Sequence, residues 1–382
     1  MPGWFETPKP KNFRKIHPYD HRWITEIAVL GNDIPRHPNL GTYLLRSNVL
    51  LTNSARTGRS GIAFFCPNIA YLGGDIDTVL VRPTLFIPDA MQVVEHLCKY
   101  SGMACKVSDK GFYTQDIIRK VGDLATLATF LRDPIIRAVL EKFLDKTRPG
   151  QGVEDEGIVL RDRRYVNLLS VAKILGDHES CRKIIDRFVA IGLFHRGFVF
   201  HCRFCRAADW FAVGEVTEEF SCKRCSKTQK YTSQNFKANE PEWFYKLDEI
   251  PYLGLENNMQ VPLLALDCLR RRSKRSFMYT TDLEIIPQDD SKPTMEIDIC
   301  CIVDGILTIG EAKTQNRLDS SATREIESLT RYRDLARKIL PRRVVFATWA
   351  ERWSDTTQER IREAFTELPV EVNLLESRDL LS

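Results

Sequence analysis

The sequence predicts a multidomain protein of mixed α/β and α+β class. Short apolar runs broken by Gly and Pro alternate with helical stripes, two Cys-x-x-Cys pairs lie mid-chain, and the last third is predicted to run helix, two-stranded hairpin, helix, strand. Its 382 residues correspond to two or three domains at about 150 residues each. Hydrophobic residues make up 43% and charged residues 28%, which excludes bulk disorder and a fibrous repeat.

The net charge and the number of cysteines limit where the protein can be located and which partners it can have. Lys and Arg exceed Asp and Glu by only 55 to 51, so net charge alone names no acidic partner. Residues 1–14 lack the apolar core of a signal peptide, and no run approaches the ~18 apolar residues of a membrane span. The eleven cysteines are an odd number in a chain without a signal, which indicates a reducing compartment. We expect a cytoplasmic protein with no membrane partner.

Residues 1–148 are predicted to form an N-terminal α+β domain. Strands are expected over residues 52–88, a helix over 89–100, and a longer apolar stripe over 124–144 that is interrupted near Pro134. This segment carries no recognisable chemistry. We expect it to serve either as a sensor or as a docking unit for a protein partner, and we also expect a homo-oligomer.

A second unit is predicted over residues 157–200, after a polar linker. A helix over 165–175, a second helix over 179–191 and a tight hairpin over 192–200 follow one another. This order resembles a winged helix-turn-helix module, which implies DNA contact through the second helix. The alternative is a winged helix used only for packing or dimerisation.

Residues 201–235 carry the strongest motif in the chain. Cys202 and Cys205 are separated by sixteen residues from Cys222 and Cys225, a spacing that fits four thiolates on one tetrahedral Zn²⁺. The segment looks like a zinc ribbon. Because all four positions are cysteine, no site is open for substrate and the Zn²⁺ is expected to be structural. Disulfides or chance spacing are the alternative.

The C-terminal domain, residues 245–382, contains a predicted hairpin. Residues 296–303 and 306–313 are expected to be its two strands, joined by Asp304-Gly305 as a two-residue type I′ turn. Such a turn fixes the register of every pair along the hairpin.

In this register Asp298 lies opposite Glu311, and Glu296 lies opposite Lys313, with all four side chains on one face. Two carboxylates held opposite each other repel unless a positive charge lies between them. A divalent metal such as Mg²⁺ supplies that charge, and Lys313 is then placed beside an attacking water or a phosphate. The alternative is a strand face without catalytic function, exposed to solvent, on which Glu296 pairs with Lys313.

Asp298, a gap of twelve residues and then Glu311-Ala312-Lys313 resemble the core motif of the PD-(D/E)xK, or restriction-endonuclease-like, nuclease superfamily. The resemblance covers residues 256–371, and an expected helix over 321–339 followed by a strand over 344–349 agrees with the αβββαβ core of that family. Ile297 stands where the family motif has Pro.

The resemblance implies that Asp298 and Glu311 bind Mg²⁺ or Mn²⁺ and that Lys313 is a catalytic residue near the attacking water. Glu256 is the candidate for the additional acid that many members carry on the preceding helix. Ser328 and Tyr332 keep the spacing of a Gln-x-x-x-Tyr found in part of the family, but without the Gln, so that role is not carried over.

A basic run lies at the end of the helix before the hairpin. Five positive charges in six residues are expected to collect phosphate backbone next to the metal site. The run consists of Arg270, Arg271, Arg272, Lys274 and Arg275. A solvated helix end or a nuclear-import run is the alternative.

Together these expectations describe a Mg²⁺-dependent nuclease that hydrolyses nucleic acid, with DNA the expected substrate, in restriction or anti-phage defence. One competing hypothesis is a non-catalytic DNA-binding regulator, and another is a nuclease subunit active only within a larger complex. A sheet covered by helices on both faces, with Asp298 and Glu311 in a cleft, would favour the enzyme over the regulator.

Overall fold

The structure is a computed structural model, and it describes most of the chain after residue 88. Described are residues 89–144, 165–168, 172, 178–236, 241–288 and 292–382, together with four N-terminal strands. These strands are β1 (Thr25–Val29), β2 (Ser54–Gly58), β3 (Gly61–Phe65) and β4 (Thr84–Ile87), which pair in the order β2-β3-β1-β4. The predicted strand at residues 78–81 and the linker near 147–152 lie outside the described residues.

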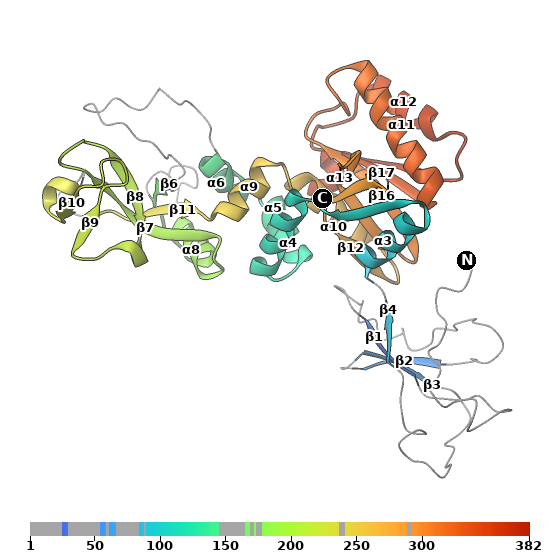
Figure 1. Ribbon diagram of the computed structural model, residues 1–382, viewed down its shortest axis with the longest axis horizontal. Helices are drawn as coiled ribbons and strands as arrows, with labels where there is room; N and C mark the ends of the chain where they lie inside the picture. The colour runs from blue at the N-terminus through green and yellow to red at the C-terminus, as the bar shows by residue number, and fades with distance from the viewer. Residues whose placement is uncertain are drawn as a thin grey trace, which may run out of the picture.

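A five-stranded mixed sheet in the order β12-β15-β16-β17-β18 forms the centre of the C-terminal unit. Figure 1 draws this unit in orange and red. The first three strands of the sheet pair antiparallel, and β16, β17 and β18 pair parallel. The strands are β12 (Phe277–Thr280), β15 (Ile299–Val303), β16 (Ile306–Lys313), β17 (Arg343–Thr348) and β18 (Glu371–Leu375).

Helices cover both faces of this sheet. Cys301 and Val345 share a core with α10 (Gln260–Arg272), whereas their neighbours Cys300 and Phe346 share a core with the helices of the other face. Parallel strands require crossover connections, and α11 (Ala322–Ile339) and α12 (Asp355–Phe365) provide them. The short α13 (Ser377–Leu381) packs beside α10. The result is a three-layer arrangement of helix, sheet and helix.

The predicted hairpin is confirmed at its turn. Asp304 and Gly305 both have positive φ, +52° and +81°, as a type I′ turn requires. The pairs from Ile299 with Gly310 to Val303 with Ile306 have the predicted register. The predicted helix and strand that follow are present as α11, capped by Ser321, and β17.

The first strand of that hairpin bends at Asp298, and the residues before the bend leave the sheet. Strand β14 (Met295–Ile297) pairs with β13 (Leu283–Pro287), which puts Glu296 opposite Glu284. The expectation that Glu296 faces Lys313 is therefore wrong. Glu296 instead forms an ion pair with Lys110, at 2.6 Å.

Residues 89–144 pack with the C-terminal unit, although the sequence analysis assigned them to the N-terminal domain 1–148. Strand β5 (Met103–Val107) extends the β14-β13 pair into a three-stranded sheet. Helix α4 packs against α9, and α5 packs against α10. The C-terminal unit therefore also includes residues that precede the predicted boundary at residue 245. The helices of this region are α3 (Ala90–Tyr100), α4 (Asp109–Val121), α5 (Leu124–Arg132), α6 (Pro134–Leu144) and α9 (Glu249–Glu256).

The middle unit has a four-stranded sheet in the order β6-β11-β7-β8. Its elements are β6 (Tyr165–Asn167), α8 (His178–Ala190), β7 (Phe194–His201), β8 (Ala208–Ala212) and β11 (Phe244–Leu247). Helix α8 agrees with the predicted second helix. The predicted first helix is wrong at residues 165–167, because this segment is a strand that pairs with β11.

The predicted hairpin over residues 192–200 is also wrong. Gly192, with φ +73°, ends α8, and β7 then runs without a turn. Gly197 does not turn the chain. A Cβ at this position would lie 2.1 Å from the carbonyl oxygen of Phe211 and 2.7 Å from the Trp210 ring, so glycine permits close pairing with β8.

Gly310 has a similar role in the central sheet, immediately before Glu311. A Cβ there would lie 2.0 Å from the carbonyl oxygen of Val345. We therefore expect Gly310→Ala to lower the free energy of unfolding by about 3 kcal/mol or more, since a backbone atom cannot move aside cheaply. The control is Gly214→Ala, because an added Cβ at Gly214 meets nothing within 4 Å. Equal thermal midpoints for the two variants would contradict this prediction.

Candidate active site and metal centre

Four cysteine side chains converge at the end of the middle unit and could hold a metal ion such as zinc. The sulfur atoms of Cys202, Cys205, Cys222 and Cys225 all lie within 4.8 Å of one another. The Sγ atoms of Cys202 and Cys225 are 3.6 Å apart, as are those of Cys205 and Cys222. Four thiolates at this separation are the donor set of a closed tetrahedral site.

Two equivalent turns bring these sulfurs together. Arg206 and Ser226 each follow the second cysteine of a pair, and both have φ of +57°. In each turn the amide of this residue donates to the carbonyl oxygen of the first cysteine, at 2.9 and 2.8 Å. The two pairs therefore have the same local geometry, as expected from two identical Cys-x-x-Cys motifs.

The surroundings of Cys202 favour its thiolate form. Burial alone would raise the pKa of this thiol, but hydrogen bonds from backbone amides and from Gln229 Nε2, at 3.2 Å, outweigh it and lower the pKa to about 6.

The segment 201–235 around the four cysteines contains little other secondary structure of its own. Beside β8 it has the small strands β9 (Glu219–Ser221) and β10 (Thr228–Lys230) and the turns η1 (Val213–Glu215) and η2 (Ser233–Asn235). Its hydrophobic cluster has three buried side chains, Phe200, Phe211 and Phe220, with partly buried residues such as Tyr231 and Phe236 packed against them.

Asp298, Glu311 and Lys313 come together at one end of the β15-β16 pair. The backbone amide of Asp298 donates to the Gly310 carbonyl at 3.1 Å, and its carboxylate accepts from the Ala312 amide at 2.9 Å. Glu311 is only 8% exposed, and its Oε1 lies 2.6 Å from Lys313 Nζ. Glu311 points toward the α11 side of the sheet, which is the side of Ile309, two residues earlier on β16.

A third acid, Asp282, belongs to this group and was missed in the sequence. It lies between β12 and β13 and is 4% exposed. Burial, and then the charges of Glu311 and Asp282, raise the pKa of Asp298 well above its usual range. The pKa of Asp282 is likewise raised to about 6, mainly by burial, with Glu296 and Glu311 adding repulsion. We call Asp282, Asp298 and Glu311 the acidic cluster.

The N-terminal helix α4 supplies a second lysine to this end of the sheet. Lys110 pairs with Glu296, and burial would lower its pKa, but Glu296, Asp298 and Asp282 raise it. The start of α4 is held against the Asp282 segment, because the Ser108 amide donates to the Asp282 carbonyl at 3.0 Å. Gly111 allows this approach, since a Cβ there would lie 2.5 Å from the same oxygen.

Tyr332 of α11 fixes the position of Glu311. Its hydroxyl is 2.5 Å from Glu311 Oε2 and 3.0 Å from the carbonyl oxygens of Glu296 and Gly310. The phenol is 2% exposed, and its pKa is raised well above the usual range by burial and by the charges of Glu311 and Asp298. The spacing of Ser328 and Tyr332 in the sequence was a signal for this residue.

Glu256 is on α9, and the basic run begins on α10. Glu256 ends α9, and its carboxylate accepts from Tyr252 Oη at 3.4 Å. The basic run starts in the last turn of α10 and continues beside the Asp304 turn, where the amides of Lys274 and Arg275 donate to the Asp304 carboxylate. Asp304 follows Asp298 by six positions, across the five residues of β15, which corresponds to about 20 Å. The run therefore lies at the opposite end of the hairpin from the acidic cluster, not next to it.

Three arginines of the run have carboxylate partners within the protein. Asp267 is fully buried, and Arg270 Nε and Arg271 Nε lie 2.8 and 3.1 Å from its carboxylate, which also pairs with Arg132. Arg272 pairs with Asp379 at 2.7 Å. Arg270 and Arg271 thus pair within α10, while Arg272 links α10 to α13, which accounts for part of the basic run without nucleic acid.

Aromatic and basic side chains are exposed together on the middle unit. Trp243 is 41% exposed, stacks on Phe198 with ring centroids 4.4 Å apart, and has the Arg196 guanidinium 5.4 Å from its ring centroid. Phe204, 56% exposed, lies on the first cysteine turn with Lys227 Nζ at 4.7 Å from its ring. Such pairs suit stacking on bases beside phosphates.

No family model, curated protein or solved structure matches this chain. Among the residues that the structure describes, no helix is both long and apolar enough to cross a bilayer.

The raised pKa of Asp282 makes stability depend on pH. The folded state binds the Asp282 proton more tightly than the unfolded state does. The stabilisation of the folded state by this proton is therefore complete below about pH 4 and is lost as pH rises through about 6. The pKa of Asp282 in the folded protein lies about two units above its usual value, which corresponds to about 3 kcal/mol in the free energy of unfolding. Without added Mg²⁺ or Mn²⁺, we expect Asp282→Asn to match the wild type in thermal midpoint at pH 4 and to exceed it increasingly up to pH 7. The control is Asp334→Asn, at an exposed acid, whose difference in thermal midpoint from the wild type should not change between pH 4 and pH 7. The same constant difference for Asp282→Asn would contradict the prediction.

Proposed function

We propose that the protein is a metal-dependent nuclease whose active site contains Asp298, Glu311 and Lys313. The observation that carries the proposal is the acidic cluster itself: burial and the charge of Glu311 raise the pKa of both Asp298 and Asp282, and Lys313 pairs with Glu311 at 2.6 Å. Unfavourable clustering of this kind is typical of functional sites. The cover of helices on both faces of the sheet and the burial of Glu311 favour an enzyme over an exposed salt-bridged surface.

Asp298 and Glu311 are the residues that would hold Mg²⁺ or Mn²⁺. Hard carboxylate oxygens suit these ions, and Mg²⁺ needs only one or two protein carboxylates because water and substrate phosphate complete its shell. Asp282 adds negative charge behind them. A bound ion would lower the pKa of a water and neutralise charge on the phosphate that is attacked.

Lys313 is the positive group that would face the substrate. Burial would lower the pKa of its ammonium, but Glu311 and Asp298 raise it, so the side chain is a cation in the metal-free protein. Its charge stabilises the additional negative charge that develops on the phosphate in the transition state. Tyr332 positions Glu311, and Lys110 keeps Glu296 neutralised beside the site.

The middle unit would hold the nucleic acid, with DNA the proposed substrate. A structural Zn²⁺ on the four cysteines would order the segment that exposes Phe204, while Trp243 and Arg196 offer a stacking surface on the adjoining sheet. We extend the proposal to a role in restriction or anti-phage defence, since a nuclease joined to its own DNA-binding unit suits that task.

The test is cleavage of labelled linear and circular DNA by the zinc-loaded full chain, with Mg²⁺, with Mn²⁺, and with Ca²⁺ as a non-catalytic ion. We expect cutting with Mg²⁺ or Mn²⁺ only. Cutting of the circular substrate would identify an endonuclease. Binding of DNA without cutting under all three conditions would contradict the proposal and favour the DNA-binding regulator, whereas cutting that appears only after addition of a cell extract would identify a subunit of a larger complex.

A further inference from the structure

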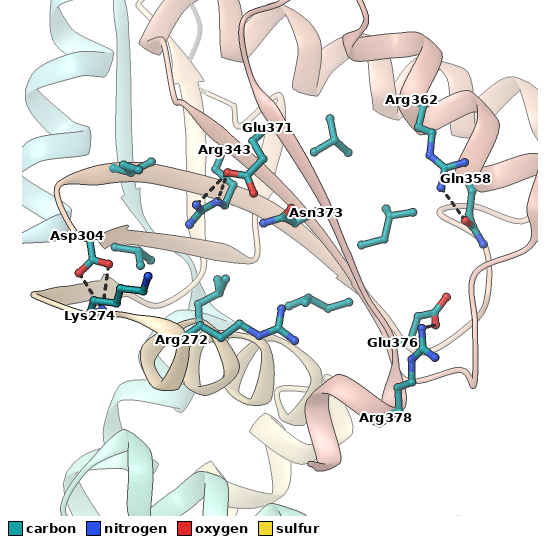
Figure 2. A pocket seen from close by; sticks show the side chains of 16 residues that line it. Arg272, Lys274, Asp304, Arg343, Gln358, Arg362, Glu371, Asn373, Glu376 and Arg378 are labelled. Atoms are coloured by element: carbon teal, nitrogen blue, oxygen red, sulfur yellow. Dashed lines mark hydrogen bonds and ion pairs between the residues drawn. The ribbon is translucent and has the colours of Figure 1, made fainter.

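A cavity of about 730 Å³ opens at the end of the central sheet that carries the Asp304 turn, away from the acidic cluster. Figure 2 shows side chains from the end of α10, from β17, from α12 and from α13 around it. The volume is that of a site for a small organic ligand rather than for a single inorganic ion. Nothing in the proposed nuclease mechanism uses this cavity.

The lining carries more positive than negative charge. Five cationic side chains contribute to it, against three carboxylates. The cations are Arg272, Lys274, Arg343, Arg362 and Arg378, and the acids are Asp304, Glu371 and Glu376.

Two of the acids are already neutralised, and the third is committed to the backbone. Glu371 binds the Arg343 guanidinium through two nitrogens, at 2.9 and 3.0 Å, and Glu376 lies 3.3 Å from Arg378. The Asp304 carboxylate accepts amides of residues 274–276, which keeps its pKa below the usual range despite partial burial. These contacts leave the net positive charge of the cavity in place.

Two cations on opposite walls remain available to a ligand. Within the described residues, neither the Lys274 ammonium nor the Arg362 guanidinium has a carboxylate partner, and Arg362 donates only to Gln358 Oε1 at 3.2 Å. Figure 2 shows Lys274 and Arg362 on opposite sides of the hollow. Apolar side chains, including Val303, Ile306 and Leu374, lie between the charged groups.

We propose that this cavity binds a nucleotide that carries two or more phosphate groups. Separated cations match an extended chain of phosphates, the guanidinium groups offer paired donors to phosphate oxygens, and the apolar wall accepts the nucleoside. The same chemistry is present in a free nucleotide and in the end of a nucleic-acid strand. The size of the cavity favours the free nucleotide.

The test is the fluorescence anisotropy of mant-ADP with the zinc-loaded full chain, in the absence of added Mg²⁺. Unlabelled ADP, adenosine and a short single-stranded DNA serve as competitors. We expect saturable binding that ADP displaces and adenosine does not. We also expect Lys274→Ala combined with Arg362→Ala to weaken binding at least tenfold, or about 1.4 kcal/mol. Lys338→Ala, an exposed lysine of α11 outside the cavity, should leave binding unchanged.

Several results would overturn the proposal: no rise in anisotropy, displacement by adenosine as effective as by ADP, or equal affinity in the double variant and Lys338→Ala. Displacement by DNA but not by ADP would also overturn it and would identify a strand-binding subsite. The removed side chains make no ion pair with the described residues, so the thermal midpoint should stay unchanged, and Lys274→Glu provides a second variant that should abolish binding. Because the assay measures no cleavage, its outcome is independent of the nuclease proposal.

Discussion

Asp298→Asn should lower the rate of metal-dependent DNA cleavage by about 10³-fold or more, a loss typical of removing a principal stabiliser of the transition state. The amide keeps the shape of the carboxyl group and can still accept from the Ala312 amide, so the bend at Asp298 should be retained. What the variant lacks is the negative charge that the metal requires. Initial rates on labelled DNA at saturating Mg²⁺ measure the effect.

The matched control for this prediction is Glu327→Gln on α11. Glu327 is an exposed acid of the helix that also carries Tyr332, and it lies outside the acidic cluster. Its rate should equal that of the wild type. Both proteins should bind the DNA fragment with equal affinity, because Asp298 is assigned to chemistry and not to binding. Cleavage by Asp298→Asn at the control rate would refute the assignment of this residue.

Removal of the metal from the four cysteines should unfold the segment 201–235 while the central sheet stays folded. The segment has only three buried aromatic side chains as its own core, which is too little to replace an ion whose binding free energy is typically about 10 kcal/mol or more. Limited proteolysis with mass spectrometry should find new cleavage sites within 201–235 after chelation or in Cys222→Ser.

The control for the zinc prediction is Phe204→Ala, which changes the exposed tip of the first cysteine turn and leaves the four sulfurs in place. It should retain one Zn²⁺ per chain by elemental analysis and resist proteolysis. Chelated protein that keeps the protection pattern of the zinc-loaded chain would show that the segment does not depend on a metal.

Local signals in the sequence predicted much of the C-terminal unit. Asp304-Gly305 needs two residues with positive φ, and this requirement predicted the register that is observed from Ile299 with Gly310 to Val303 with Ile306. The stripe over residues 124–144 broke at Pro134, where α6 begins. The predictions were wrong where pairing between distant segments overrode the local sequence pattern. At Asp298, for example, the chain bends, and the residues before the bend pair with β13 instead of continuing the hairpin.

The rest of the candidate site depends on contacts between distant segments. Lys110 and Asp282 are 172 positions apart, and only the docking of α4 on the β12-β13 connection brings them together. No periodicity or motif marks either residue. A local signal did exist for the basic run, because Asp267 precedes Arg270 and Arg271 by three and four residues, the spacing of helical ion pairs.

The most direct test of the account is whether the acidic cluster binds a divalent ion. Mn²⁺ binding to the zinc-loaded chain can be measured by electron paramagnetic resonance, with wild type, Asp298→Asn and Glu327→Gln compared at pH 7.5. The account predicts bound Mn²⁺ in the wild type and in Glu327→Gln, competed by Mg²⁺, and loss of that binding in Asp298→Asn. Equal Mn²⁺ binding by all three proteins, or none by the wild type, would contradict it.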